Sequence, residues 1–102
     1  MTNIARFWDD AVVPTLVDYI RIPAKSPHFD HEWARHGHID AAVKLAAAWC
    51  QRHAVAGMKL EVVRLENRTP VLFLEVEGKG SGNVLIYGHL DKQPEMTGWR
   101  EG

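Results

Sequence analysis

Cysteine is almost absent from this sequence, because Cys50 is the only one among 102 residues. A single thiol excludes an intrachain disulfide and is consistent with a cytoplasmic protein, which is the location we expect. Long apolar runs are also absent, and none approaches the roughly 20 residues that a membrane-spanning helix requires. The N-terminal region lacks the basic-then-apolar pattern of a signal peptide. We therefore expect no membrane association.

An excess of charge of either sign is missing as well. The sequence has 12 Lys and Arg residues against 13 Asp and Glu residues, for a net charge of −1. Nucleic-acid-binding domains usually carry a clear basic excess, so we expect no nucleic acid as a partner. The composition is otherwise that of a globular protein, with 46% hydrophobic and 25% charged residues. A chain of this length forms one small domain or part of a larger one.

Two segments have the apolar spacing of amphipathic helices. Residues 3–21 carry one apolar stripe before Pro14 and another in a shifted phase after it, with Asn3 as the N-cap. Because proline cannot donate the backbone hydrogen bond of a helix, we expect a kink or a break near Pro14. Residues 38–56 form the clearer helix, and Gly57 is suited to be its C-cap.

The remainder of the chain predicts three strands. Residues 59–65 and 71–77 alternate between apolar and polar positions, and the turn between them predicts an antiparallel hairpin. Residues 84–87 form an unbroken, partly β-branched apolar run, which is typical of a strand that is buried on both faces. The predicted fold class is therefore α/β, with two helices followed by three strands in the order ααβββ.

A histidine and a carboxylate follow the third predicted strand, two residues apart. Residues at this spacing in an extended segment face the same side, and ligand sites of open α/β sheets lie at the carboxyl ends of strands. His89 could then bind a metal through one ring nitrogen while Asp91 accepts a hydrogen bond from the other, which raises the basicity of the ligand. The alternative is a polar pair without function at a sheet edge, and spacing alone favours this alternative.

Four further histidines lie in residues 28–38. His31 and Glu32 followed by His36 resemble a zincin motif with one residue too many, so that the two imidazole rings would not share a helix face. We therefore expect a solvated or packing loop here. The glycine-rich residues 78–82 lack the spacing of a phosphate-binding loop, and we expect a flexible connection.

Residues 87–94, Tyr-Gly-His-Leu-Asp-Lys-Gln-Pro, and the following Gly-Trp at 98–99 carry a family resemblance. They resemble the first metal-site motif of metallopeptidase family 20, the family of aminoacylases, carboxypeptidase G and carnosinase-type dipeptidases. The Gln-Pro pair and the tryptophan are closest to the dipeptidase branch, whereas Lys92 stands where a small apolar residue is more usual. The resemblance covers the whole chain, because the order of its predicted elements is also the order in which such enzymes begin.

This resemblance implies that residues 1–102 are the incomplete N-terminal portion of a catalytic domain, an α/β/α sandwich into which a lid domain is inserted. It implies hydrolysis of dipeptides or N-acyl amino acids with two zinc ions, which polarise the scissile carbonyl and lower the pKa of a bridging water. His89 matches the first metal ligand, and Asp91 matches the catalytic carboxylate that orients it. The family's other site residues come later in sequence, and Glu95 and Glu101 do not match them.

We therefore predict the N-terminal segment of a zinc-dependent peptidase that acts on a small peptide or N-acyl amino acid, and we predict that the segment alone is inactive. The alternatives are a small non-catalytic binding domain derived from such an enzyme and a one-metal acyl hydrolase assembled between chains. Because both faces of residues 84–87 are apolar, we also expect the isolated chain either to self-associate as a homo-oligomer or to be marginally stable.

Overall fold

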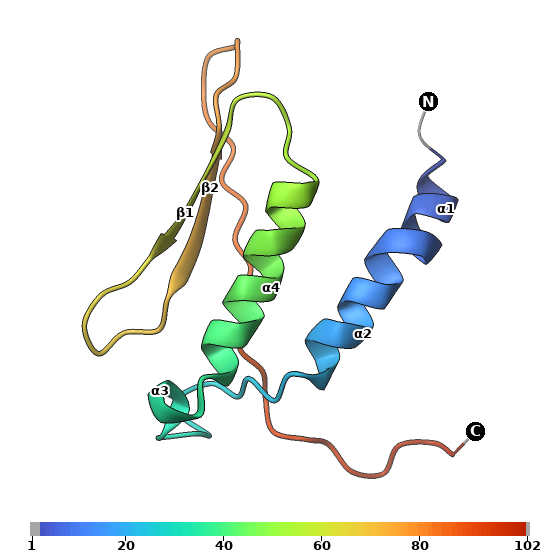
Figure 1. Cartoon of the computed structure of the whole chain (residues 1–102), viewed down its shortest axis with the longest axis vertical. Coiled ribbons are helices and arrows are strands. Elements are labelled where there is room, and N and C mark those ends of the chain that lie inside the picture. Colours follow the sequence, from blue (N-terminus) through green and yellow to red (C-terminus); the bar gives the residue numbers. More distant parts are fainter. Residues whose placement is uncertain (1–2, 102) are drawn as a thin grey trace.

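The computed structural model of this protein describes residues 3–101, which form a mixed α/β structure (Figure 1). Its elements are α1 (Ile4–Phe7), the π-helical turn η1 (Trp8–Val12), α2 (Val13–Arg21), α3 (Trp33–His36), α4 (His38–Arg52), β1 (Met58–Val63) and β2 (Val71–Val76). The first three elements form one continuous helical stretch of 18 residues. Helix α4 lies between this stretch and the hairpin (Figure 1). No helix within residues 3–101 combines the length and hydropathy that a membrane span requires.

The first helical stretch passes through Pro14 without the break that the sequence suggests. Asn3 caps its start as predicted, because the Asn3 side chain accepts a hydrogen bond from the backbone N–H of Arg6. Directly before Pro14, the backbone N–H of Val13 bonds to the carbonyl of Trp8, five residues back. Such a π-helical turn contains one more residue than an α-helical turn. The turn therefore accounts for the phase shift between the two apolar stripes.

Helix α4 is shorter than predicted. It ends at Arg52 instead of residue 56, and His53 is its C-cap residue. Gly57 has a φ of +78°, but it shapes the turn that enters β1, in which the Met58 N–H bonds to the Val55 carbonyl over 3.1 Å. The left-handed conformation expected for Gly57 is thus present, whereas its role as the helix C-cap was predicted wrongly.

The buried core lies where the C-terminal end of α2, the loop that follows it and the start of α4 meet. Ala24 is 1% exposed and Ala42 is fully buried, and Ile39 completes this cluster. Partly buried side chains pack against it from α2, the following loop and α3, namely Tyr19, Ile22 and Trp33. Alanine side chains allow the α4 backbone to approach the loop closely, and this junction holds the cluster of buried residues in the described chain.

The predicted hairpin is present, and the predicted third strand is not. Strands β1 and β2 pair antiparallel, with Met58 opposite Val76 and Val63 opposite Val71. Residues 84–87 are extended, but they pair with no strand among the described residues, and their exposure is 86–90%. The predicted order ααβββ is therefore wrong in its last element, and it also lacks the short helix α3 that precedes α4. Burial on both faces requires neighbouring strands and covering layers, whereas the two described strands pair only with each other.

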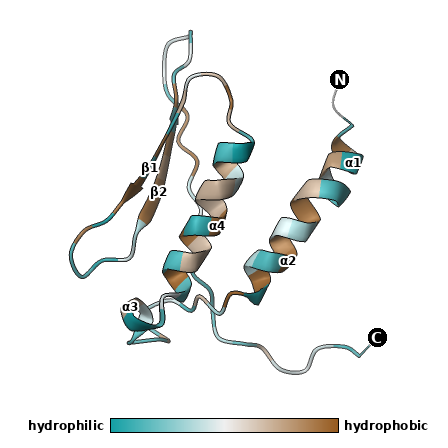
Figure 2. Ribbon diagram, in the orientation of Figure 1, coloured by the Kyte–Doolittle hydropathy of each residue, from teal (hydrophilic) through white to brown (hydrophobic). Residues whose placement is uncertain are grey.

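The exposed run at residues 84–87 predicts self-association of the 102-residue chain. An extended apolar segment with unpaired backbone groups is a template for strand pairing. The hairpin also consists largely of hydrophobic residues (Figure 2), and Val71, Phe73 and Val76 on β2 are exposed. We expect sedimentation velocity to show a mass that rises with protein concentration. The charge introduced by Leu85→Lys should shift the chain towards the monomer. Met96→Lys is the matched control, because Met96 is also exposed but lies outside the run. A wild-type chain that stays monomeric at high concentration would contradict this prediction.

Candidate functional site

The candidate site is the pair formed by His89 and Asp91, which lies on an irregular segment after the exposed run. His89 Nδ1 lies 2.9 Å from Asp91 Oδ1 and 2.9 Å from the Asp91 backbone oxygen. Because neither oxygen carries a hydrogen, Nδ1 must be the donor. In the neutral ring the Nε2 lone pair then points away from these bonds, and no hydrogen bond to Nε2 is found within the described chain. The predicted hydrogen bond between the two residues is present, and it selects the tautomer that a metal ligand requires.

The pair is open to solvent on one side and borders an apolar groove. The His89 side chain is 65% exposed and that of Asp91 is 35% exposed. His89 and Leu90 line an open groove of about 380 Å³ between α2 and α4, whose other walls include Leu16 and Trp49. A small molecule that reaches His89 would therefore meet an apolar surface beside a polar ring nitrogen.

Tyr19, near the end of α2, holds the segment that carries the pair. Its hydroxyl donates a hydrogen bond to the Leu90 carbonyl over 2.7 Å. Burial raises the pKa of the Tyr19 hydroxyl, and the negative charge of Asp91 raises it further. The hydroxyl therefore keeps its proton at neutral pH and remains a donor to the residue between His89 and Asp91.

Lys92 holds the same segment from the other side of Asp91. Its ammonium donates to the carbonyls of Tyr19, Ile20 and Ile22 at the C-terminal end of α2, and it lies 4.2 Å from the centre of the Tyr19 ring. A cation is favourable at this end of a helix, where backbone carbonyls lack partners. Burial lowers the pKa of the Lys92 ammonium because it removes water from the charged form.

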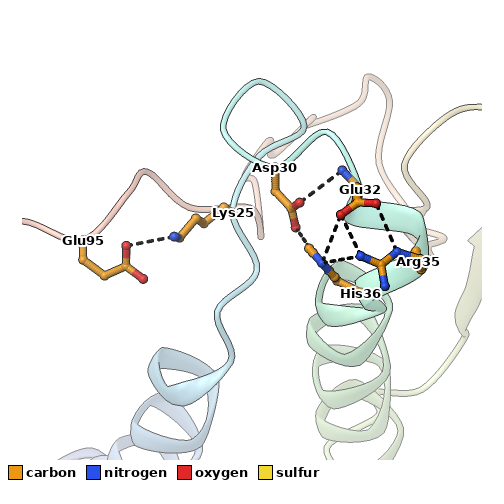
Figure 3. A network of polar contacts seen from close by, with 6 residues as sticks. All are labelled: Lys25, Asp30, Glu32, Arg35, His36 and Glu95. Carbon is orange, nitrogen blue, oxygen red and sulfur yellow. Dashed lines mark hydrogen bonds and ion pairs between the residues drawn. The ribbon is translucent and has the colours of Figure 1, made fainter.

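The backbone of Lys92 is anchored as well. Its N–H bonds to the Ala24 carbonyl over 2.8 Å, and its carbonyl accepts from the Ser26 N–H over 3.0 Å, so that the two segments run parallel at this point. Further along the chain, Lys25 Nζ lies 3.0 Å from Glu95 Oε2 (Figure 3). Sequence reasoning did not identify Tyr19 or Lys92 as site residues. The one signal was the departure of Lys92 from the small apolar residue usual in the family.

The histidine-rich loop forms a local polar network apart from this pair. His36 Nδ1 lies 2.7 Å from Asp30 Oδ2, and Arg35 Nη2 lies 2.7 Å from Glu32 Oε2 (Figure 3). The hydrogen bond from His36 is the main reason why the pKa of Asp30 is lowered. These side chains bond to one another. The sequence predicts a solvated or packing loop over residues 28–38, whereas Trp33–His36 within it form the short helix α3.

The donor set fits one ligand of a zinc site and no more. His89 has an available ring nitrogen and a carboxylate behind the other nitrogen, which is the usual arrangement of a zinc-bound histidine. A catalytic zinc normally has three protein ligands. Within residues 3–101, no group of three or more potential metal ligands is found. The described residues therefore provide no basis for deriving a metal-dependent step.

No protein-family model matches this sequence, and no curated protein is significantly similar to it. A functional assignment therefore depends on the motif and on the geometry of the His89–Asp91 pair.

Proposed function

We propose that this chain is the N-terminal portion of the catalytic domain of a zinc-dependent dipeptidase or N-acyl amino acid hydrolase. The observation that supports the proposal best is the 2.9 Å hydrogen bond from His89 Nδ1 to Asp91 Oδ1. It occurs within the motif that resembles the first metal-site motif of metallopeptidase family 20. A pair of this kind is common at protein surfaces, and it is the combination of motif and geometry that favours a metal ligand.

In this proposal each residue of the pair has one role. His89 offers Nε2 to one of two zinc ions, and when bound the zinc ions polarise the scissile carbonyl and lower the pKa of a water. Asp91 holds the proton on Nδ1 and makes the imidazole a stronger ligand. The apolar groove beside His89 provides a surface against which a small peptide or N-acyl amino acid can pack.

The exposed run at residues 84–87 favours a second candidate function, a non-catalytic interaction domain. An apolar extended run that is 86–90% exposed is suited to pairing with another chain. The reading frame past Gly102 separates the two candidates. A glycine-rich motif with an aspartate within a few dozen residues would support the hydrolase, whereas a stop codon would support the interaction domain.

Asp91→Asn tests the role of the carboxylate in the proposed hydrolase. The neutral amide cannot stabilise Nδ1–H as a carboxylate does, and loss of such a partner typically costs about 10–100-fold in metal affinity or activity. We expect kcat/KM for a dipeptide to fall within this range while the circular dichroism spectrum stays unchanged. Asp9→Asn, at an exposed position on the first helical stretch, is the matched control and should retain full activity. Equal activity of the two variants would refute the assigned role.

A further inference from the structure

We propose that Lys92 is a positioning residue, whose ammonium caps the C-terminal end of α2 and thereby holds Asp91 in hydrogen-bond contact with His89. The consequence for catalysis rests on the proposed function, whereas the geometric claim stands independently of it. Three observations support the claim, namely the hydrogen bonds of the ammonium to the end of α2, the anchoring on both sides of Asp91 and the exposure of the pair.

The end of α2 lacks a backbone donor that a helix normally uses. The Tyr19 carbonyl would ordinarily accept from the N–H of the residue four positions later, but that residue is Pro23, which has none. The Tyr19 carbonyl instead accepts a hydrogen bond from the Ile22 N–H over 3.1 Å, and the Ile22 carbonyl accepts one from the Ala24 N–H over 2.8 Å. Lys92 adds hydrogen bonds to the carbonyls of Tyr19, Ile20 and Ile22. An ammonium has three hydrogens, so one side chain can satisfy all three acceptors.

Besides this cap, hydrogen bonds hold the backbone on both sides of Asp91. Lys92 is joined to Ala24, which is 1% exposed and belongs to the buried core, by the 2.8 Å bond from its own N–H. On the other side of Asp91, the Leu90 carbonyl accepts from Tyr19 over 2.7 Å. Asp91 thus lies between two hydrogen bonds, one to Ala24 in the buried core and one from Tyr19, which packs against that core.

The His89–Asp91 contact depends on these anchors because the pair is poorly shielded. The side chains of His89 and Asp91 are 65% and 35% exposed, so water competes for the hydrogen bond between them. Exposed contacts of this kind contribute little to stability when nothing else restrains the two groups. An apolar residue at position 92 could pack against the Tyr19 ring but could not bond to the three carbonyls. At position 92, the charged lysine therefore holds the segment by hydrogen bonds to α2, where a small apolar residue would hold it by packing alone.

The test is the tautomer of His89 in the metal-free 102-residue chain, read from the ¹⁵N resonances of its ring at a pH where the ring is neutral. In the wild type, Nδ1 should resonate as a protonated nitrogen. In Lys92→Met it should shift towards the unprotonated position, because the carboxylate is no longer held in place. Lys79→Met is the matched control, since Lys79 is exposed and makes no hydrogen bond or ion pair within the described chain. An unchanged His89 tautomer in a folded Lys92→Met chain would overturn the inference.

A second measurement covers the case in which Lys92→Met does not fold. In the wild-type chain at low temperature, the Lys92 ammonium protons should exchange with water slowly enough to give a separate signal, whereas those of Lys79 should not. Absence of the Lys92 signal would also overturn the inference. In the proposed hydrolase, Lys92→Met should lower kcat towards the value of Asp91→Asn with little change in KM. The tautomer test uses no zinc and no substrate, so its failure and the failure of the proposed function are distinguishable.

Discussion

Replacing His89 with alanine is expected to remove most of the activity of the proposed hydrolase and to weaken one of its two zinc sites. The change deletes the only ligand that the motif offers through a ring nitrogen, and Asp91 is then left without the group that it orients. Because loss of an outer partner alone typically costs about 10–100-fold, loss of the ligand itself should cost more. The measurements are kcat/KM for a dipeptide and the zinc content of the purified protein.

His31→Ala is the matched control for this experiment. His31 is exposed and has no hydrogen bond or ion pair within residues 3–101, so its removal should change neither the rate nor the zinc content. A His89→Ala enzyme that retains its normal rate and two zinc ions per chain would show that the family assignment is wrong. A loss of both in His31→Ala as well would point to a general effect on folding.

The second prediction is that the 102-residue chain by itself has no function. We expect no peptidase turnover above buffer and no submicromolar zinc binding. The reason is the number of ligands, since a catalytic zinc normally has three protein ligands and the described residues hold no group of three potential donors. Asp91 is engaged with His89 Nδ1, so it is placed to orient the ligand and not to join it. No general base is positioned beside His89 in the described structure.

Zinc titration by calorimetry, combined with a dipeptide hydrolysis assay, tests both parts of this prediction. Adventitious binding can arise at the histidine-rich loop, where His36 lies 2.7 Å from Asp30. His36→Ala identifies that contribution, because it should remove weak binding at the loop and leave the His89 region intact. Submicromolar binding that disappears in His89→Ala, or turnover above buffer, would reveal a complete site that the described residues do not display.

The sequence by itself determined the features that depend on neighbouring residues. These features are the Asn3 cap, the apolar face of α4 and the pairing of β1 with β2. They follow from side-chain chemistry and from the spacing of residues that are near one another in the sequence. The contact between His89 and Asp91 belongs to the same class. The spacing of the two residues within one short segment was sufficient to predict the bond, whereas the anchors that hold this segment lie elsewhere in the chain.

The tertiary structure decided the features that depend on what a segment packs against. Residues 84–87 have the composition of a buried strand, but burial requires neighbours, and none pairs with them in the described chain. Pro14 was expected to kink or break the helix, and the helical stretch continues through it with a π-helical turn directly before it. Lys92 and Tyr19 are more than seventy residues apart in sequence, and only the folded chain brings the Lys92 ammonium to the carbonyls of Tyr19, Ile20 and Ile22 at the end of α2. A local sequence pattern does not show which distant segment will supply the ammonium, because the contact forms only when the two segments pack together.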